Sequence, residues 1–277
     1  MTTATLGPSQ NLAPQERSTG FGRLLRAEWT KIRSVRSTAW SLAILVVAAI
    51  GFDIVITAVT MASWRTATAA DKAIYLADPT GFLGPALLLA QIPLCVLGVM
   101  VTAGEYSTGM IRSSVLAVPR RTPVLAAKAA VFAAITFVVG EVVAFASFLI
   151  GQQIISHHIP VSLSDPAVLR AVFGMGLYVT VLGLFGLAIG GVIRHTGAAI
   201  TVAVGFVVVL SNLAQALPGS IGRHIAAYLP TNAGVLITHA HQEGSDLLSP
   251  WQGFGVLCLW TALFLGAAAY LLRRRDV

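Results

Sequence analysis

The sequence predicts an all-α, polytopic membrane protein with six transmembrane helices. Hydrophobic residues make up 56% of its 277 positions, charged residues only 10%, and the mean hydropathy is +0.81. A soluble protein of this size normally has a much larger fraction of charged residues. The apolar residues form long continuous runs rather than alternating, which favours helices over barrel strands because a helix satisfies its own backbone in lipid.

Each predicted span has about the 20 apolar residues that a helix needs to cross the hydrocarbon layer. The first is longer than the apolar part of a secretion signal, so we interpret it as a retained anchor. We expect a flexible tail over 1–20, an interfacial helix over 21–38 and a single six-helix domain over 39–277. The six spans are Ala39–Met61, Leu83–Ala103, Ala129–Ile155, Ala171–Ile193, Ala198–Leu217 and Phe254–Leu272.

Lysine and arginine are distributed asymmetrically about these spans. With the N-terminus inside, the outer segments hold only four, which are Arg65, Lys72, Arg170 and Arg223. The other 14 of the 18 lie on the inside, in the tail, in the second and fourth connections and at the C-terminus. The positive-inside rule therefore predicts a cell-membrane protein with both termini in the cytoplasm, and assigns its basic charge to orientation and lipid headgroups rather than nucleic acid.

The segment before the first span is amphipathic. At about 100° per residue, its apolar side chains share one side of a helix over Phe21–Val35, opposite basic residues. This pattern predicts a helix lying on the inner leaflet, with Trp29, Lys31 and Arg33 among its residues. Glu28 projects from the apolar stripe. It pairs either with a basic residue of the cytoplasmic loops or, as we favour, locally beside Lys31.

The chain lacks the motifs of common catalytic and nucleotide sites. It contains no Gly-x-x-x-x-Gly-Lys-Ser/Thr, no His-Glu-x-x-His and no Gly-x-Ser-x-Gly, so we predict no catalytic residue and no cofactor site. His239 and His241 lie in an outer loop and are interpreted as solvated side chains rather than metal ligands. Cys95 and Cys258 fall inside apolar runs and are interpreted as core or lipid-facing side chains.

Two acidic residues, Asp53 and Glu141, lie deep within predicted spans. Burying a charge in lipid is costly, so such residues relay protons or else face the bundle interior in a protonated or hydrogen-bonded state, beside groups such as Ser147 or Asn212. Gly186 and Gly190 stand in Gly-x-x-x-Gly register, which permits close helix approach. We expect that approach within the subunit rather than at a dimer seam.

The segment Gly104–Pro123 joins the second and third spans on the predicted inner side. On a helix over about 105–118, Glu105, Thr108 and Arg112 share a polar face, opposite an apolar face. Pro119 and Pro123 are expected to end this helix. The segment either docks into a groove of a soluble domain or is an ordinary basic loop that fixes topology.

Gly104–Pro123 resembles the signature of ABC-2-type transporter permeases, in which Glu-Tyr/Trp-x-x-Gly-x-x-Arg follows the second span. Four other places resemble the same family, in order along nearly the whole chain. They are Ala27–Thr38, Arg194–Ile200, Leu229–Gly234 and Arg273–Asp276. The Ala- and Val-rich spans and these motif variants resemble actinobacterial members.

This resemblance implies a six-helix permease subunit that pairs with a second permease and with two separate ATP-binding subunits that hold ATP and Mg²⁺. We expect a homodimer, because six spans alone enclose little of a pathway, and a non-identical second permease stays an alternative. It implies that Gly104–Pro123 is a coupling helix against the ATPase, and that Pro218–Gly253 forms extracellular or re-entrant helices that close an outer gate. The residues that the resemblance assigns to coupling are Glu105, Tyr106, Thr108, Gly109 and Arg112, with Arg120 and Arg121 at the rim.

Two rival functions remain compatible with the residues. One is a proton-coupled secondary transporter that uses Asp53 and Glu141. The other is a membrane scaffold or sensor that recruits a soluble protein without transport. No residue pattern in the chain selects a transported substrate.

Overall fold

The computed structural model describes residues 20–34, 36–110, 121–242, 244 and 246–274. These residues form helices and connecting turns, and no strand occurs among them, as the sequence predicts. The predicted tail over 1–20 lies outside this part of the chain except for Gly20. In chain order the helices are α1 (Phe21–Ser34), α2 (Arg36–Ala62), α3 (Ala69–Ala77), η1 (Gly81–Leu83), α4 (Gly84–Ser107), α6 (Arg121–Ile155), α7 (Pro166–Ile193), α8 (Thr196–Val204), η2 (Gly205–Leu210), α9 (Ser211–Gln215), α10 (Gly219–Ala227), α11 (Pro230–Val235), η3 (Leu236–Thr238) and α12 (Pro250–Arg274).

Six helical segments are long and apolar enough to cross a membrane, which confirms the predicted number. They are Ala39–Ala62, Gly81–Ser107, Thr122–Ile155, Pro166–Ile193, Thr196–Gln215 and Pro250–Arg274. The fourth begins before the predicted Ala171 because the Asp165 side chain accepts a hydrogen bond from Ala167 N, and Pro166 suits a first helical turn.

The third span differs most from its predicted start at Ala129. α6 already begins at Arg121, so Pro123 lies in its first turn, and the prediction that Pro123 ends the preceding helix is wrong. A first turn tolerates proline because its N–H groups have no partner within the helix. Lys128 consequently lies within α6 rather than in a loop.

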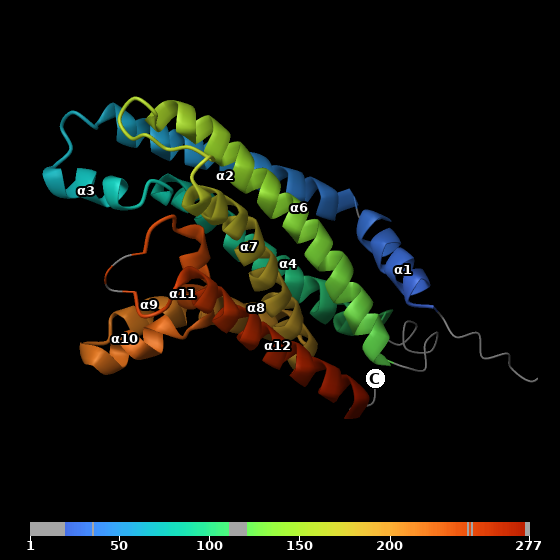
Figure 1. The fold of residues 1–277 in the computed structure, drawn as a ribbon. Coiled ribbons are helices and arrows are strands. Elements are labelled where there is room, and N and C mark those ends of the chain that lie inside the picture. The colour runs from blue at the N-terminus through green and yellow to red at the C-terminus, as the bar shows by residue number, and fades with distance from the viewer. Residues whose placement is uncertain (1–19, 35, 111–120, 243, 245, 275–277) are drawn as a thin grey trace, which may run out of the picture.

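The basic residues of the chain divide between the two ends of the bundle. Figure 1 shows α3 and α10 at one end and α1 with the C-terminal end of α12 at the other. The basic residues that the sequence assigns to opposite sides of the membrane follow this division. Lys31, Lys128 and Arg194 lie toward the α1 end, whereas Lys72 and Arg223 belong to α3 and α10.

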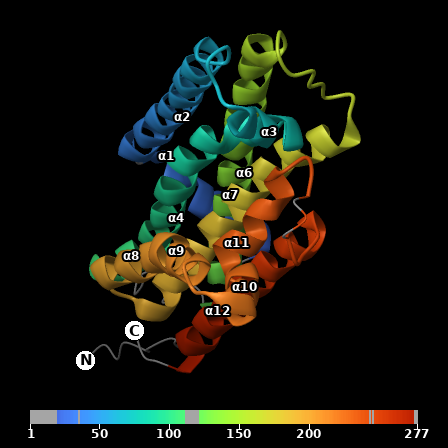
Figure 2. The same ribbon diagram turned by 90° about the vertical axis from the view of Figure 1, so that its left-hand side faces the viewer.

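α7 lies at the centre of the bundle (Figure 2), and most of its residues are buried. It packs against α4 through glycines. A Cβ at Gly190 would lie 2.7 Å from Val99 O, and one at Gly186 or Gly98 would overlap a backbone oxygen of the facing helix. The structure thus confirms that the Gly-x-x-x-Gly pair packs within the subunit, where close approach also allows Thr102 Oγ1 to donate to Leu187 O over 2.7 Å.

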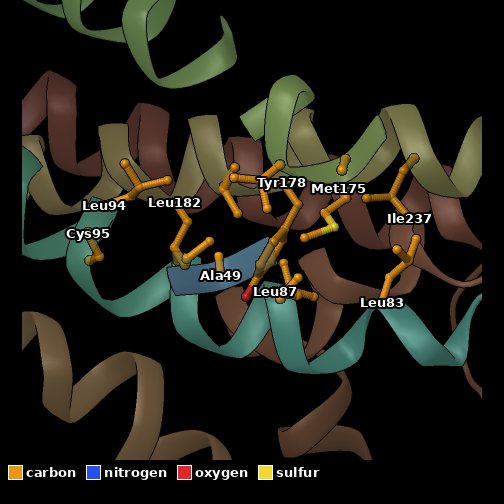
Figure 3. Close-up of a cluster of buried hydrophobic side chains, with 14 of the residues drawn as sticks. Ala49, Leu83, Leu87, Leu94, Cys95, Met175, Tyr178, Leu182 and Ile237 are labelled. Atoms are coloured by element: carbon orange, nitrogen blue, oxygen red, sulfur yellow. The ribbon is translucent and has the colours of Figure 1, made fainter. Parts of the chain in front are cut away.

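Figure 3 shows the centre of this packing, where Tyr178 and Leu182 of α7 meet Leu87 and Leu94 of α4. Cys95 belongs to the same cluster and is buried as a free thiol, as the sequence predicts. Tyr178 is fully buried, but its hydroxyl donates to Gln91 Oε1 over 3.0 Å. A polar group in the core is therefore satisfied.

The fifth span is interrupted by a π-helix. α8 leads into η2, which has π-helical geometry, and α9 completes the crossing. At the far end of η2, Ser211 Oγ donates to Phe206 O over 3.2 Å, and Asn212 Nδ2 donates to Val208 O over 2.7 Å. Side chains thus bond carbonyls in the segment where the regular helical pattern changes.

The end of the bundle that carries α10 contains helices that cross only part of its depth. α10, α11 and η3 lie within Pro218–Gly253, the segment for which the family resemblance implies helices. α3 was not predicted. The spacing of Thr68 and Asp71, three residues apart, is the sequence signal of a helix start that could have revealed it. In the structure Asp71 N donates to Thr68 Oγ1 and Thr68 N donates to Asp71 Oδ2, both over 3.2 Å.

Candidate functional site: a buried charge cluster

α1 contacts the bundle through one side only. Leu24 and Glu28 are buried, one turn apart, and Leu24 packs against Val124 and Ala127 of α6. Trp29 stays 49% exposed, on the part of the helix that faces away from the bundle. The apolar stripe that the sequence shows is therefore divided between a face for α6 and a face available to lipid.

Four side chains of alternating charge form a closed cluster where α1, α4 and α6 meet. Lys128 Nζ of α6 lies 2.9 Å from Glu28 Oε2 and 2.6 Å from Glu105 Oε1. Lys31 Nζ lies 2.7 Å from Glu28 Oε1 and 3.1 Å from the same Glu105 oxygen. Each ammonium group thus bridges both carboxylates. We call Glu28, Lys31, Glu105 and Lys128 the charge cluster.

The charge cluster is largely removed from solvent. The side chains of Glu28 and Lys128 are each 5% exposed, that of Glu105 10% and that of Lys31 33%. Charges buried to this degree are tolerated only when opposite charges and hydrogen bonds compensate the lost hydration. The formal charges of the four groups sum to zero, which satisfies this condition.

The pKa values of the two α1 members reflect this pairing. Burial alone raises the pKa of Glu28, but the charge of Lys128 and the hydrogen bonds from both ammonium groups outweigh it, and the pKa falls below its ordinary value. Burial likewise lowers the pKa of Lys31, and its bonds to Glu28 and Glu105 raise it above the ordinary value. Both groups are therefore charged at neutral pH.

Further contacts connect the same end of the bundle to the remaining spans. The Arg194 guanidinium lies over the Tyr106 ring, with 4.9 Å from Cζ to the ring centroid, and donates to Leu271 O of α12 over 2.9 Å. Arg194 also ends α7 in the left-handed conformation, at φ 61°. Arg273 of α12 donates to Thr122 of α6 over 2.9 Å.

The residues assigned to coupling therefore divide into three groups. Glu105 is buried in the charge cluster and Tyr106 contacts Arg194, so both face other parts of the chain. Thr108 and Gly109 are exposed just after α4, where Gly109 has a φ of 72° that favours glycine. Arg112, Arg120 and the body of the expected helix over 105–118 lie outside the described residues, as does the side chain of Arg121. Of the interfacial helix, Trp29 and Arg33 are exposed whereas Glu28 and Lys31 belong to the charge cluster.

The two intramembrane carboxyls lie apart from the charge cluster. Asp53 is fully buried, and its Oδ1 accepts from Ala86 N, in the first turn of α4, over 3.3 Å. Glu141 packs against Gly176 of α7, and neither of its oxygens has a hydrogen-bond partner in the described part of the chain. Among those residues, neither carboxyl bonds to an ionisable side chain.

Lys128 and Arg194 are the contributors that sequence reasoning missed. Lys128 was counted only among the orienting charges on the inner side, and Arg194 was noted only there and in the motif Arg194–Ile200, without a contact of its own. Lys128 stands among alanines, with Ala126–Ala127 before it and Ala129–Ala130 after it. A single charge in an otherwise apolar helical stretch is a signal that it has a buried partner.

Comparison with known proteins agrees with this architecture. The family model described as ABC-2 family transporter protein matches residues 24–212, which is more than half of the chain and includes most of α1, the charge cluster, four whole spans and most of the fifth. No curated protein matches the chain. The match gives no information on the source organism, so the actinobacterial resemblance stays a prediction. The chain is a multi-span membrane protein of the ABC-2 transporter family.

Proposed function

We propose that this chain is the permease subunit of an ATP-driven exporter. It forms the substrate pathway with a second permease protomer, and separate ATP-binding subunits supply the energy of ATP with Mg²⁺. Family membership supports a transmembrane transporter, and members of the family generally work with ATP-binding subunits. The dimer, the ATP-binding partners and the outward direction are the parts that we add.

The observation that carries the proposal is the charge cluster at the end of α4. Glu105 is fixed by two ammonium groups, one from α1 and one from α6. Two residues later, α4 ends and the chain enters the segment that resembles a coupling helix. A force applied to that segment acts directly on the buried junction of three helices, because close-packed and charge-paired elements move together rather than deforming.

The aromatic contact extends this linkage to the rest of the bundle. Tyr106 follows Glu105 and supports Arg194, which holds the end of α7 and the last turns of α12. We therefore assign Glu105 and Tyr106 as positioning residues that transmit the movement of the coupling segment. The exposed Thr108 and Gly109, and the segment that follows them, are the part we assign to contact with the ATP-binding subunit.

The test compares Glu105→Gln with Ser107→Ala in the complete complex, purified through a tag on this chain and placed in nanodiscs. Ser107 is exposed at the end of α4 and bonds only to Gly104 O, at 2.9 Å, among the described residues, so it serves as the matched control. Spin labels at position 221 of the two protomers report the opposite end of the bundle, because Ile221 is 75% exposed in α10.

In the control, ATP binding is expected to change the distance between the two labels. In Glu105→Gln, we expect ATP hydrolysis to continue while the distance change is lost, because the neutral amide no longer holds both ammonium groups. A full distance change in Glu105→Gln would remove the charge cluster from the coupling path. Copurification of no ATP-binding protein with the wild-type chain would contradict the exporter itself.

A further inference from the structure

A cavity of about 320 Å³ lies at the end of the bundle opposite to the charge cluster. Its walls come from the start of α4, from the η2–α9 part of the fifth span, and from α11 and η3. In Figure 2 these elements gather at the end that faces the viewer. The volume is within the range of cavities that bind small molecules, and the predicted topology places it on the extracytoplasmic side.

The cavity is amphipathic. Leu87, Met175 and Val207 contribute apolar surface. Hydroxyl and amide side chains also line it, and those that matter here are Gln91, Ser211, Gln215, Thr231 and Asn232. A hydrocarbon segment and a hydrogen-bonding group can therefore be accommodated side by side.

Two of the polar groups have unused hydrogen-bonding capacity. Thr231 is 8% exposed, and its Oγ1 lies near the Tyr178 hydroxyl but makes no well-formed hydrogen bond in the described part of the chain. Gln91 uses its Oε1 to accept from Tyr178, which leaves its amide nitrogen as a donor on the cavity wall. Buried polar groups normally have partners, so Thr231 marks a position where a bound molecule would supply one, and the partly buried Gln91 offers a donor beside it.

Asn232 connects the cavity to the π-helical segment. Its Nδ2 donates to Ser211 O and its Oδ1 accepts from Gln215, both over 3.3 Å, so one amide joins α11 to α9. These distances are at the long end of the hydrogen-bond range. A ligand hydroxyl or amide can replace such bonds at small cost and thereby change the contact between α11 and the fifth span.

The charges around the cavity favour uncharged ligands over strongly charged ones. Among the described lining residues, the ionisable ones are Asp78 and His239, and no lysine or arginine is present to pair an anionic head group. Asp78 already accepts from Thr80 and Ala240 N through Oδ1, and its Oδ2 lies 3.2 Å from His239 Nδ1. A cationic head group would compete with these bonds, whereas an uncharged one would not.

We propose that this cavity binds an uncharged amphiphile, with hydroxyl or amide groups on a single hydrocarbon chain, and that such a molecule is the cargo. Only the second statement rests on the proposed exporter function. Thr231 and Gln91 bond the head group, Asn232 exchanges a bond with it, and Leu87 and Val207 contact the chain.

Binding is measured on the full chain in nanodiscs without any ATP-binding subunit. The probe is octyl glucoside with a photoreactive diazirine in the alkyl chain, and the labelled residues are mapped by mass spectrometry. Unlabelled octyl glucoside is expected to displace the probe at concentrations about tenfold lower than octyl phosphate or octyltrimethylammonium, since each charged head group forfeits at least one hydrogen bond or ion pair.

A matched pair of glycine variants tests whether the probe occupies the cavity. Gly84 lines the cavity, has αR geometry, and has no atom within 4 Å of an added Cβ, so Gly84→Phe fills the space without backbone strain. Gly255 on the exposed side of α12 is equally unobstructed, and Gly255→Phe is the control. Labelling is expected to disappear only in Gly84→Phe, and Thr231→Val is expected to weaken binding about tenfold at unchanged thermal stability.

Equal displacement by all three octyl compounds, or labelling that survives Gly84→Phe, would overturn the binding site. If the wild-type cavity is labelled selectively but Gly84→Phe still transports at the wild-type rate with ATP, the cavity is not the cargo site, and the exporter function is unaffected. Selective binding in a chain that supports no ATP-driven transport would leave the binding site standing and reject the exporter.

Discussion

Lys128 Nζ lies 2.6 Å from Glu105 Oε1, although the two residues are 23 positions apart in the sequence. Glu105 lies near the C-terminal end of α4, and Lys128 lies in the N-terminal part of α6. The segment that resembles a coupling helix, Gly104–Pro123, begins in the last turn of α4 and ends in the first turn of α6. Both of its ends are therefore anchored to one buried ion pair, and α1 is bound to the same pair through Glu28 and Lys31. The charge cluster thus joins α1, α4 and α6 at one buried point.

Lys128→Met is expected to destabilise the protein by about 3–5 kcal/mol. The variant leaves the carboxylates of Glu28 and Glu105 buried with only Lys31, whose side chain is 33% exposed, to pair with them, and an uncompensated buried charge is costly. The measurement is the free energy of unfolding of the purified chain in mixed micelles, followed by helical circular dichroism.

The double variant Lys128→Met, Glu105→Met provides the internal comparison. It removes one positive and one negative charge together and leaves the Glu28–Lys31 pair intact, so it should be more stable than the single variant. Arg33→Ala, on the exposed side of α1, should change the free energy of unfolding by no more than about 0.5 kcal/mol. A double variant less stable than Lys128→Met would show that charge burial is not the controlling factor.

The docking of α1 onto α6 should be insensitive to pH across the neutral range. The pKa of Glu28 is lowered in the folded state, so its contribution is present above the unfolded value and is lost only as pH falls through the folded pKa, below 4.5. The pKa of Lys31 is raised, so its contribution is present below the unfolded value of 10.5 and is lost as pH rises through the folded pKa.

Distances between spin labels on α1 and α6 measure this docking across the pH range. We expect a constant distance between these two limits and a broader distribution beyond each. In Glu28→Gln the acid transition should disappear, since the group that takes up the proton is gone. An α1 that separates from α6 between pH 5 and 8 would contradict the assigned ionisation states.

The spans and α1 could be predicted from the sequence because their signals are local. Continuous apolar runs determine the crossing helices, and the 100° pattern determines α1. The burial of Gly186 and Gly190 against α4 was also predictable, since small residues four positions apart allow close approach.

The charge cluster could be predicted only in part. The sequence offers Glu28 both a local and a distant partner, and in the structure it has both, Lys31 and Lys128. That Lys128 also bonds Glu105 depends on the relative positions of α4 and α6, which no local pattern encodes. The π-helix η2 and the cavity beside it likewise depend on how the fifth span packs against α11.

Gly98→Ala is expected to destabilise the bundle by about 1–3 kcal/mol or more, because the added methyl would meet Gly183 O and would lie 2.9 Å from Leu187 N of α7. Backbone atoms cannot rotate away as side chains do. Gly51→Ala in α2 is the control, since no atom lies within 4 Å of its Cβ and alanine favours the helix by about 1 kcal/mol. Thermal unfolding of both variants in detergent distinguishes them, and equal midpoints would contradict the tight α4–α7 contact.

Glu141→Gln is expected to retain ATP-dependent transport and to remain unaffected when the proton gradient is dissipated. The Glu141 side chain packs against Gly176 and has no hydrogen-bond partner among the described residues, so a neutral amide of the same shape fits the site, and ATP-driven export needs no proton at this position. Asp53→Asn is the companion variant, because the amide oxygen can still accept from Ala86 N.

Transport is followed with labelled octyl glucoside in proteoliposomes, with ATP and a proton uncoupler varied separately. If both variants abolish transport, and wild-type transport persists without ATP but collapses with the gradient, the two carboxyls are the coupling groups of a proton-driven transporter.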